Sequence, residues 1–198
     1  MKIYGDRSSG NCYKITLVCS ILNITHEWFP MDIMKGDTKS VSFLEKNPNG
    51  KIPLLELDDG RVLSESNAIL NYLAHDSDLI PKNQFNYYKV LQWQFFEQYS
   101  HEPYIAVARF INKYLGLPPE RMDEYKAKQI GGVKALKVME EQLSKTDYLV
   151  GDRFSVADIS LFAYTHVANE GGFSLDPFPY LKEWILRIRS EKGFCEMV

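Results

Sequence analysis

The stretch that decides the fold is NPNGKIPLLELDDGRVLSESNAIL, residues 47–70. Its first seven residues are rich in turn formers, and the apolar run that follows, residues 54–57, predicts a strand. Asp58-Asp59-Gly60 is typical of a hairpin turn, so residues 61–63 are expected to form the returning strand. Apolar residues at helical spacing then predict a helix over residues 65–74. The segment is therefore predicted to form two antiparallel strands followed by a helix.

The residues before this segment predict a strand, a helix and a second strand. Residues 2–5 form a short strand pattern, and apolar residues at helical spacing indicate a helix over residues 12–22. Residues 26–33 are rich in bulky side chains and predict a strand, in which Pro30 indicates a sheet edge or a bend. A short helix is expected over residues 42–46. The first part of the chain thus has the order βαβ followed by ββα.

The chain changes character after about residue 85, where no strand pattern is found. Helical periodicity predicts four helices: residues 88–115 with a bend at Pro103, residues 120–145, and two that begin near Val156 and Pro177. We expect three divisions of the chain: an α/β domain over residues 1–78, a linker over residues 79–86 and an all-helical domain over residues 87–198.

A strong local signal lies at the start of the third of these helices. Ser155 and Asp158 have the S-x-x-D spacing of a capping box, and Phe154 and Ile159 occupy the two positions of a hydrophobic staple. We interpret this cluster as structural, because it explains the beginning of a helix without requiring a ligand.

The composition excludes several classes of protein. The 198 residues are 45% hydrophobic and 25% charged, which is typical of a globular chain. The net charge of −3 disfavours a nucleic-acid binder. No apolar run approaches the roughly 20 residues that span a bilayer, and the N-terminus has no secretory signal pattern, so we expect a cytoplasmic protein. Three cysteines and four histidines show neither a disulfide framework nor metal-ligand spacing, so no metal is expected.

The sequence Ser8-Ser9-Gly10-Asn11-Cys12 lies where the first strand meets the first helix. A helix N-terminus presents unpaired N–H groups and a positive dipole end, which stabilise a thiolate or another anion. Ser9 and Cys12 have the spacing of a C-x-x-C motif with serine in the first place. A hydroxyl there cannot exchange disulfides, but it can donate a hydrogen bond to a ligand's thiolate. A serine helix cap and a buried cysteine explain the same residues, and both interpretations stay open.

Two other segments suit a peptide-like ligand. If the bond between Ile52 and Pro53 is cis, the backbone of Ile52 could face outward and pair with an extended ligand; a plain trans turn is the alternative. At the next helix start, Ser66 could bind a carboxylate and Glu65 could accept a hydrogen bond from an ammonium group. A capped helix with an acidic first turn explains these residues equally well.

Taken together, these pieces resemble the cytosolic glutathione transferase family over essentially the whole chain. The resemblance depends on the βαβ–ββα order, on residues 47–53 and 65–69, and on residues 150–158 in register. It implies an α/β thioredoxin-like N-terminal domain, an all-α C-terminal domain, glutathione bound on the first, and an electrophile bound between the two.

The resemblance also implies which residues bind glutathione. Backbone groups before a cis proline would pair with its cysteinyl part, two residues at a helix start would hold its γ-glutamyl group, and two lysines would lie near its carboxylates. In that sense the glutathione-binding residues are Lys39, Lys51, Ile52, Pro53, Glu65 and Ser66.

Three residues are candidates for contact with the glutathione sulfur. Ser9 matches the position at which serine-type members of the family activate the thiol. Residues 11–17 also resemble bacterial nu-class and Ure2-like members, which place Thr or Ser and then Asn beside the sulfur, so Asn11 is a joint candidate. Cys12 is the third, because beta-class bacterial members use a cysteine near this position.

A wall for the second substrate is expected on the long helix, where residues 97–104 mix aromatic and polar side chains. Tyr99, Tyr104 and Arg109 are the candidates, and a role at a domain or dimer interface is the alternative. The resemblance implies a homodimer that transfers glutathione, its co-substrate, to a small hydrophobic electrophile, a peroxide or a disulfide in detoxification. The alternatives are a glutathione-dependent disulfide reductase and a non-catalytic ligand-binding or regulatory protein.

Overall fold

The computed structural model describes residues 1–198, which divide into two compact units. The first unit comprises Met1–Ser77 together with Glu191–Val198, and the second comprises Asp78–Ser190. The last eight residues therefore belong with the α/β unit, although the sequence placed them in the helical domain. Two contacts explain this: the Tyr13 hydroxyl donates a hydrogen bond to the Cys195 carbonyl at 2.7 Å, and Gly193 lies directly against the backbone of Ile21.

The first unit is built on a four-stranded mixed sheet in the order β2-β1-β3-β4. Strand β1 (Lys2–Gly5) pairs in parallel with β2 (Glu27–Pro30) and antiparallel with β3 (Leu54–Glu56), which pairs antiparallel with β4 (Val62–Ser64). Strand β2 is an edge strand, one of the two possibilities that Pro30 indicated, but it ends at this proline and not at residue 33 as predicted. The predicted α/β thioredoxin-like domain is confirmed.

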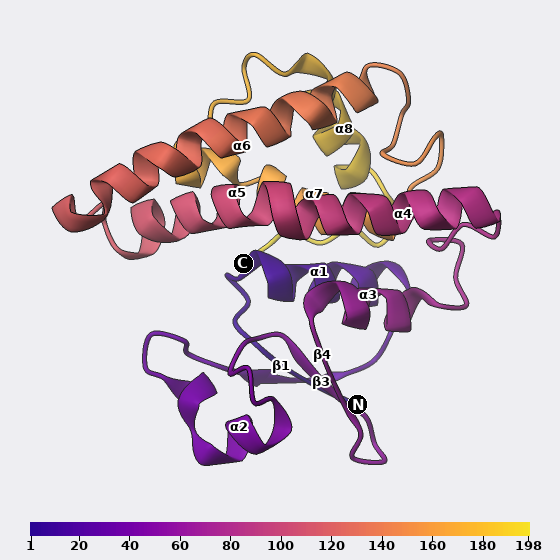
Figure 1. Ribbon diagram of the computed structural model, residues 1–198. Helices are drawn as coiled ribbons and strands as arrows, with labels where there is room; N and C mark the ends of the chain where they lie inside the picture. The colour runs from indigo at the N-terminus through magenta and orange to yellow at the C-terminus, as the bar shows by residue number, and fades with distance from the viewer. The chain divides into compact units, whose positions relative to one another are not determined.

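Two helices of this unit bring their N-termini together. Helices α1 (Gly10–Ile21) and α3 (Ser66–Ala74) lie side by side on one face of the sheet (Figure 1), and both bury apolar side chains. The short helix α2 (Val41–Lys46) and a 3-10 turn, Asp37–Lys39, lie in the connection between β2 and β3. The pairing of α1 with α3 matters for function because it places their first turns next to each other.

The second unit is all-helical, as expected. Its α-helices are α4 (Gln84–Phe96), α5 (Glu102–Arg109), α6 (Met122–Leu143), α7 (Val156–Thr165) and α8 (Pro179–Arg189), with 3-10 turns at Pro119–Arg121 and Ala168–Gly171.

The predicted long helix over residues 88–115 is present, but it contains two π-helical segments. The π-helical segment Glu97–His101 separates α4 from α5, and a second, Phe110–Tyr114, follows α5. Pro103 lies in the first turn of α5, where its missing N–H costs no hydrogen bond. The irregularity therefore lies just before the proline rather than at it.

Helix α7 is the centre of this unit, since all ten of its residues are buried. The predicted capping box between Ser155 and Asp158 is present. Asp158 is fully buried and also accepts hydrogen bonds from Leu149 N at 2.9 Å and Trp184 Nε1 at 3.0 Å. None of the helices combines the length and the apolar character that crossing a bilayer requires.

Candidate functional site

Ser9 occupies the position before α1, with an extended backbone whose carbonyl accepts a hydrogen bond from Tyr13 N at 2.8 Å. Its own N–H donates to the Asp6 carbonyl at 3.0 Å. The Ser9 side chain makes no capping bond to the helix and instead hydrogen-bonds the Cys12 thiol. The backbone thus has the geometry of a helix cap, but the hydroxyl is engaged with a different group.

Cys12 lies on the inner side of α1. Its side chain is fully buried, and a Cβ atom added to Gly5 of β1 would come within 2.9 Å of its sulfur. This burial raises the pKa of the Cys12 thiol to about 12 despite the hydrogen bond from Ser9. The thiol is therefore neutral at physiological pH, which argues for a packing role and against direct contact with a ligand.

A chain of hydrogen bonds joins the N-termini of α1 and α3. The fully buried Lys14 donates from Nζ to Ser66 Oγ at 3.1 Å, and Ser66 Oγ donates to Asn11 Oδ1 at 3.1 Å. Ser66 is the first residue of α3, and Asn11 lies in the first turn of α1. The predicted sulfur-contacting residue and the predicted γ-glutamyl-binding residue are therefore in direct contact.

The peptide bond between Ile52 and Pro53 is cis, as the resemblance implied. The side chain of the buried Asn47 braces this turn, because its Nδ2 donates to the Lys51 carbonyl at 2.7 Å. The backbone N–H and C=O of Ile52 make no hydrogen bond within the protein. An extended ligand can therefore pair with them without displacing an internal partner.

The remaining glutathione-binding candidates with charged side chains also belong to the first unit. Glu65 has a left-handed backbone, with φ 68°, and an exposed side chain. A non-glycine residue in that region of φ is strained, and such strain is concentrated at functional sites. Lys39 places its ammonium group beside Gly50, next to the exposed Lys51.

The three candidates for the second-substrate wall differ in environment. Tyr99 is 83% exposed, whereas the Tyr104 ring packs against Gly131 and under Lys128 Nζ, 5.5 Å from the ring centre. Arg109 is only 2% exposed, and its guanidinium forms an ion pair with Glu170. That internal pairing explains how a charged side chain is accommodated inside the helical unit, and it argues against the expected contact with a substrate.

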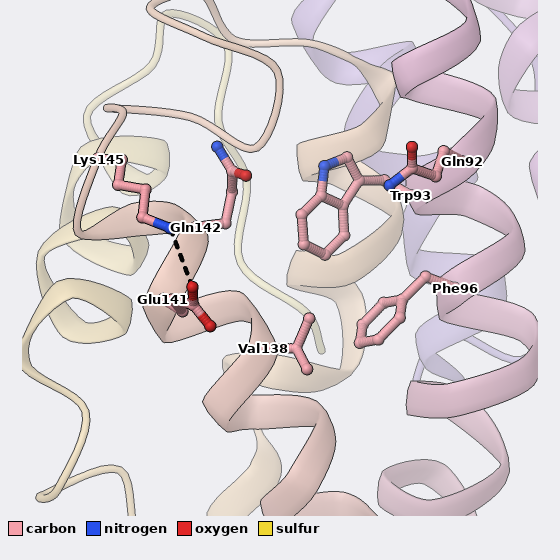
Figure 2. A pocket seen from close by; sticks show the side chains of 7 residues that line it. All are labelled: Gln92, Trp93, Phe96, Val138, Glu141, Gln142 and Lys145. Atoms are coloured by element: carbon pink, nitrogen blue, oxygen red, sulfur yellow. Dashed lines mark hydrogen bonds and ion pairs between the residues drawn. The ribbon is translucent and has the colours of Figure 1, made fainter.

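The helical unit contains a cavity of about 230 Å³ between α4 and α6. Figure 2 shows Trp93 and Phe96 of α4 on one side and Val138 of α6 on the other, near the ion pair between Lys145 and Glu141. None of Tyr99, Tyr104 and Arg109 lines it.

Comparison with known proteins agrees with this geometry. Residues 8–76 match the glutathione S-transferase N-terminal domain, and residues 95–192 match the glutathione S-transferase C-terminal domain. The chain belongs to the glutathione S-transferase family. It is similar to glutathione S-transferase 2 of Schizosaccharomyces pombe, with 30% identity over 97% of this chain and 85% of the relative.

Solved structures of glutathione S-transferases show the same fold. One from Pseudomonas fluorescens Pf-5 is 57% identical and has a TM-score of 0.98, covering 100% of this chain and 98% of that one. The glutathione transferase URE2P6 of Phanerochaete chrysosporium, solved in complex with oxidized glutathione, is 27% identical with a TM-score of 0.85, covering 97% of this chain and 91% of that one. The protein is thus a glutathione transferase enzyme, as the sequence predicted.

Sequence analysis missed two residues that shape the site of this transferase, Lys14 and Asn47. Lys14 is the only charged residue of α1, and that was the available signal; the structure shows it fully buried, which a lysine almost never is without a partner. Asn47 was noted only as a turn former, although the structure shows it bonded to the backbone of the glutathione-binding loop.

Proposed function

We propose that this transferase binds glutathione on its first unit, with Asn11 and Ser9 stabilising the thiolate and Glu65 and Ser66 holding the γ-glutamyl group. The observation that carries the proposal is the 3.1 Å contact between Ser66 and Asn11. It brings the first turns of α1 and α3 together, and the unpaired N–H groups at these two helix N-termini would suit the thiolate and the carboxylate of a single small peptide.

The chemistry requires a modest stabilisation of the thiolate. A free thiol has a pKa of about 8.5, and lowering it by about two units takes roughly 2.7 kcal/mol of preference for the anion. Hydrogen bonds to a charged group contribute about 1.5–3 kcal/mol each, so one or two donors and the α1 dipole suffice. The thiolate then attacks an electrophilic carbon, and the leaving group departs with the bonding electron pair.

Cys12 supports this site from behind. Its buried, protonated thiol packs behind Ser9, so Ser9 and Asn11, and not Cys12, are the groups that would donate to the glutathione sulfur. The ammonium group of Lys39 lies beside Gly50 in the cis-proline loop, and Lys51 of this loop is exposed, so both lysines would suit the ligand's carboxylates.

We further propose that the second substrate is a small hydrophobic electrophile or peroxide, that the enzyme acts in detoxification in the cytoplasm, and that it is a homodimer. All three cysteines are free, as expected of a reducing compartment. Phe85, Tyr88, Phe95 and Tyr99 recur at helical spacing along α4 and the turn after it, and each is more than half exposed. An exposed aromatic stripe of this kind is typical of a protein–protein interface.

The decisive experiment is a pH titration of the ultraviolet thiolate absorbance of glutathione bound to the protein. A bound-thiol pKa well below that of free glutathione is the expected result. Binding with an unshifted pKa would instead favour a non-catalytic carrier. Absence of binding would overturn the proposal, and the family membership would then describe the fold alone.

A further inference from the structure

Lys14 is a buried charged residue that the proposed mechanism has not yet used. It lies three residues after Asn11 on α1, so both side chains are on the same face of the helix. Its side chain is fully buried, and its ammonium group reaches across to α3, where it donates to Ser66 Oγ.

The chemistry of the three side chains gives this chain of hydrogen bonds a direction. An ammonium group has donors and no acceptor, so Ser66 Oγ accepts from Lys14. The hydroxyl then has one proton to give, and it gives that proton to Asn11 Oδ1. Asn11 must therefore turn its carbonyl oxygen toward α3, which places its NH2 group on the opposite edge of the amide.

We infer that Lys14 is a positioning residue for thiol activation, fixing the Asn11 amide through Ser66 so that an N–H, not a carbonyl oxygen, meets the glutathione sulfur. The inference rests on the proposed function. An asparagine amide turned by 180° has nearly the same shape but presents an acceptor, which repels a thiolate. The buried ammonium excludes that orientation by holding the Ser66 proton toward Asn11.

The same arrangement assigns two duties to Ser66. Its hydroxyl is occupied in orienting Asn11, and its backbone N–H, in the unpaired first turn of α3, serves the γ-glutamyl carboxylate. Binding of one end of glutathione and activation of the other thus pass through one residue.

The test replaces Lys14 by methionine, which has a similar length and no donor. The substitution leaves no buried hydroxyl without a partner, because Ser66 Oγ still hydrogen-bonds Asn11. Without the ammonium group, Ser66 Oγ can accept from the Asn11 NH2 group and the amide can turn over. We expect the pKa of the bound glutathione thiol to rise by about one unit, a tenfold loss of thiolate at a pH below both values. The rate at saturating glutathione should fall in parallel and recover at high pH, while the affinity for glutathione changes little.

Four further variants make the result specific. Asn11→Ala removes the donor itself, and adding Lys14→Met to it should cause no additional rise in the thiol pKa, because both act through one group. Ser66→Ala removes the middle link but keeps the backbone N–H, so it should raise the thiol pKa as Lys14→Met does, even if Lys14→Met folds poorly. Lys35→Met is the matched control, since this lysine of the same unit is 80% exposed.

The outcomes separate the inference from the function on which it rests. Equal pKa rises in Lys14→Met and Asn11→Ala, without addition in the double variant, support the inference. If the pKa of the bound thiol in Lys14→Met and in Ser66→Ala is as low as in the unmodified protein, the inference is overturned and the proposed function stands. An unshifted thiol pKa in the unmodified protein removes both together.

Discussion

Replacing Asp158 by alanine should destabilise the helical unit strongly, and the structure lets the size of the effect be worked out. The carboxylate is fully buried and accepts from four donors. Oδ1 receives Leu149 N at 2.9 Å and Trp184 Nε1 at 3.0 Å, and Oδ2 receives Ser155 N at 3.0 Å and Ser155 Oγ at 2.9 Å. The hydroxyl can find another acceptor after the substitution, but the three N–H groups stay buried without one.

Each buried donor that loses its acceptor costs about 1–3 kcal/mol. Three such donors, with some relaxation, give about 3–5 kcal/mol, at the upper end for single substitutions. Asp158→Asn keeps one acceptor oxygen, so its cost should be about half as large. A change of 1 kcal/mol lowers the melting temperature of a chain of this size by about 2–4 °C, so Asp158→Ala should melt roughly 6–20 °C lower at pH 7.

The pH dependence of this difference provides a second, independent measure. Burial raises the pKa of Asp158 to about 6 from an ordinary 3.8, although its hydrogen bonds oppose the shift. A group with a raised folded-state pKa binds protons more tightly when folded, so its contribution to stability is complete below pH 3.8 and is lost as the pH rises through 6. The alanine variant lacks this contribution. The difference in the free energy of unfolding between the unmodified protein and Asp158→Ala should therefore grow by about 1 kcal/mol as the pH falls from 7 to 5.

The assay is urea unfolding followed by circular dichroism at both pH values, with Asp152→Ala as the control, since Asp152 is exposed and only six residues away. The control should change stability by less than about 0.5 kcal/mol. The reasoning fails if Asp158→Ala behaves like the control, if Asp158→Asn costs as much as alanine, or if the difference in the free energy of unfolding shrinks on acidification.

Four further outcomes are expected. Ser9→Ala should lower the turnover number near pH 7 by about tenfold with little change in the glutathione KM, as measured by steady-state kinetics; an unchanged turnover number would leave Asn11 as the main donor. Cys12→Ala should retain a titratable bound thiolate, because the buried thiol is neutral; loss of the thiolate at unchanged fold would restore Cys12 as a catalytic group. Burial lowers the pKa of His166 to about 4, so its contribution to stability is complete above pH 6.5 and is lost as the pH falls toward 4. On acidification from pH 7 to pH 5, the free energy of unfolding of His166→Gln should accordingly fall by about 2 kcal/mol less than that of the unmodified protein. Equal decreases in urea unfolding would contradict this. Phe95→Glu should convert the proposed homodimer to a monomer in light scattering, and a persistent dimer would exclude this face as its interface.

The element order of both units followed from local patterns, because periodicity, turn formers and capping residues act over a few residues. Pro30 correctly indicated an edge strand, and Ser155 with Asp158 correctly indicated a helix start. The predicted strand over residues 26–33 was too long, since β2 ends where its pairing with β1 ends, at Pro30. The attachment of residues 191–198 to the first unit depends on contacts with α1 far away in sequence, which no local pattern contains.

The candidate site was predictable to the extent that it depends on backbone features of short segments. The placement of Ser66 at a helix start is of this kind, whereas the cis bond before Pro53 was left open by the residues and implied only by the family resemblance. The orientation of Asn11 is not, because it depends on which proton Ser66 donates, and that depends on a lysine buried between two helices.

Lys14 and Arg109 give the same sequence signal, a cation inside a helix, and the structure distinguishes them by what they bond. The Arg109 guanidinium forms an ion pair with the Glu170 carboxylate, which offsets its positive charge inside the helical unit. The ammonium group of Lys14 bonds a hydroxyl, a neutral group that it polarises and whose proton it directs onward to Asn11. A carboxylate only accepts hydrogen bonds and offsets the charge of the cation where the two meet. A hydroxyl accepts from the cation and donates its own proton to a third group. For that reason the two buried cations are assigned different roles: Arg109 stabilises the fold, and Lys14 acts on the site.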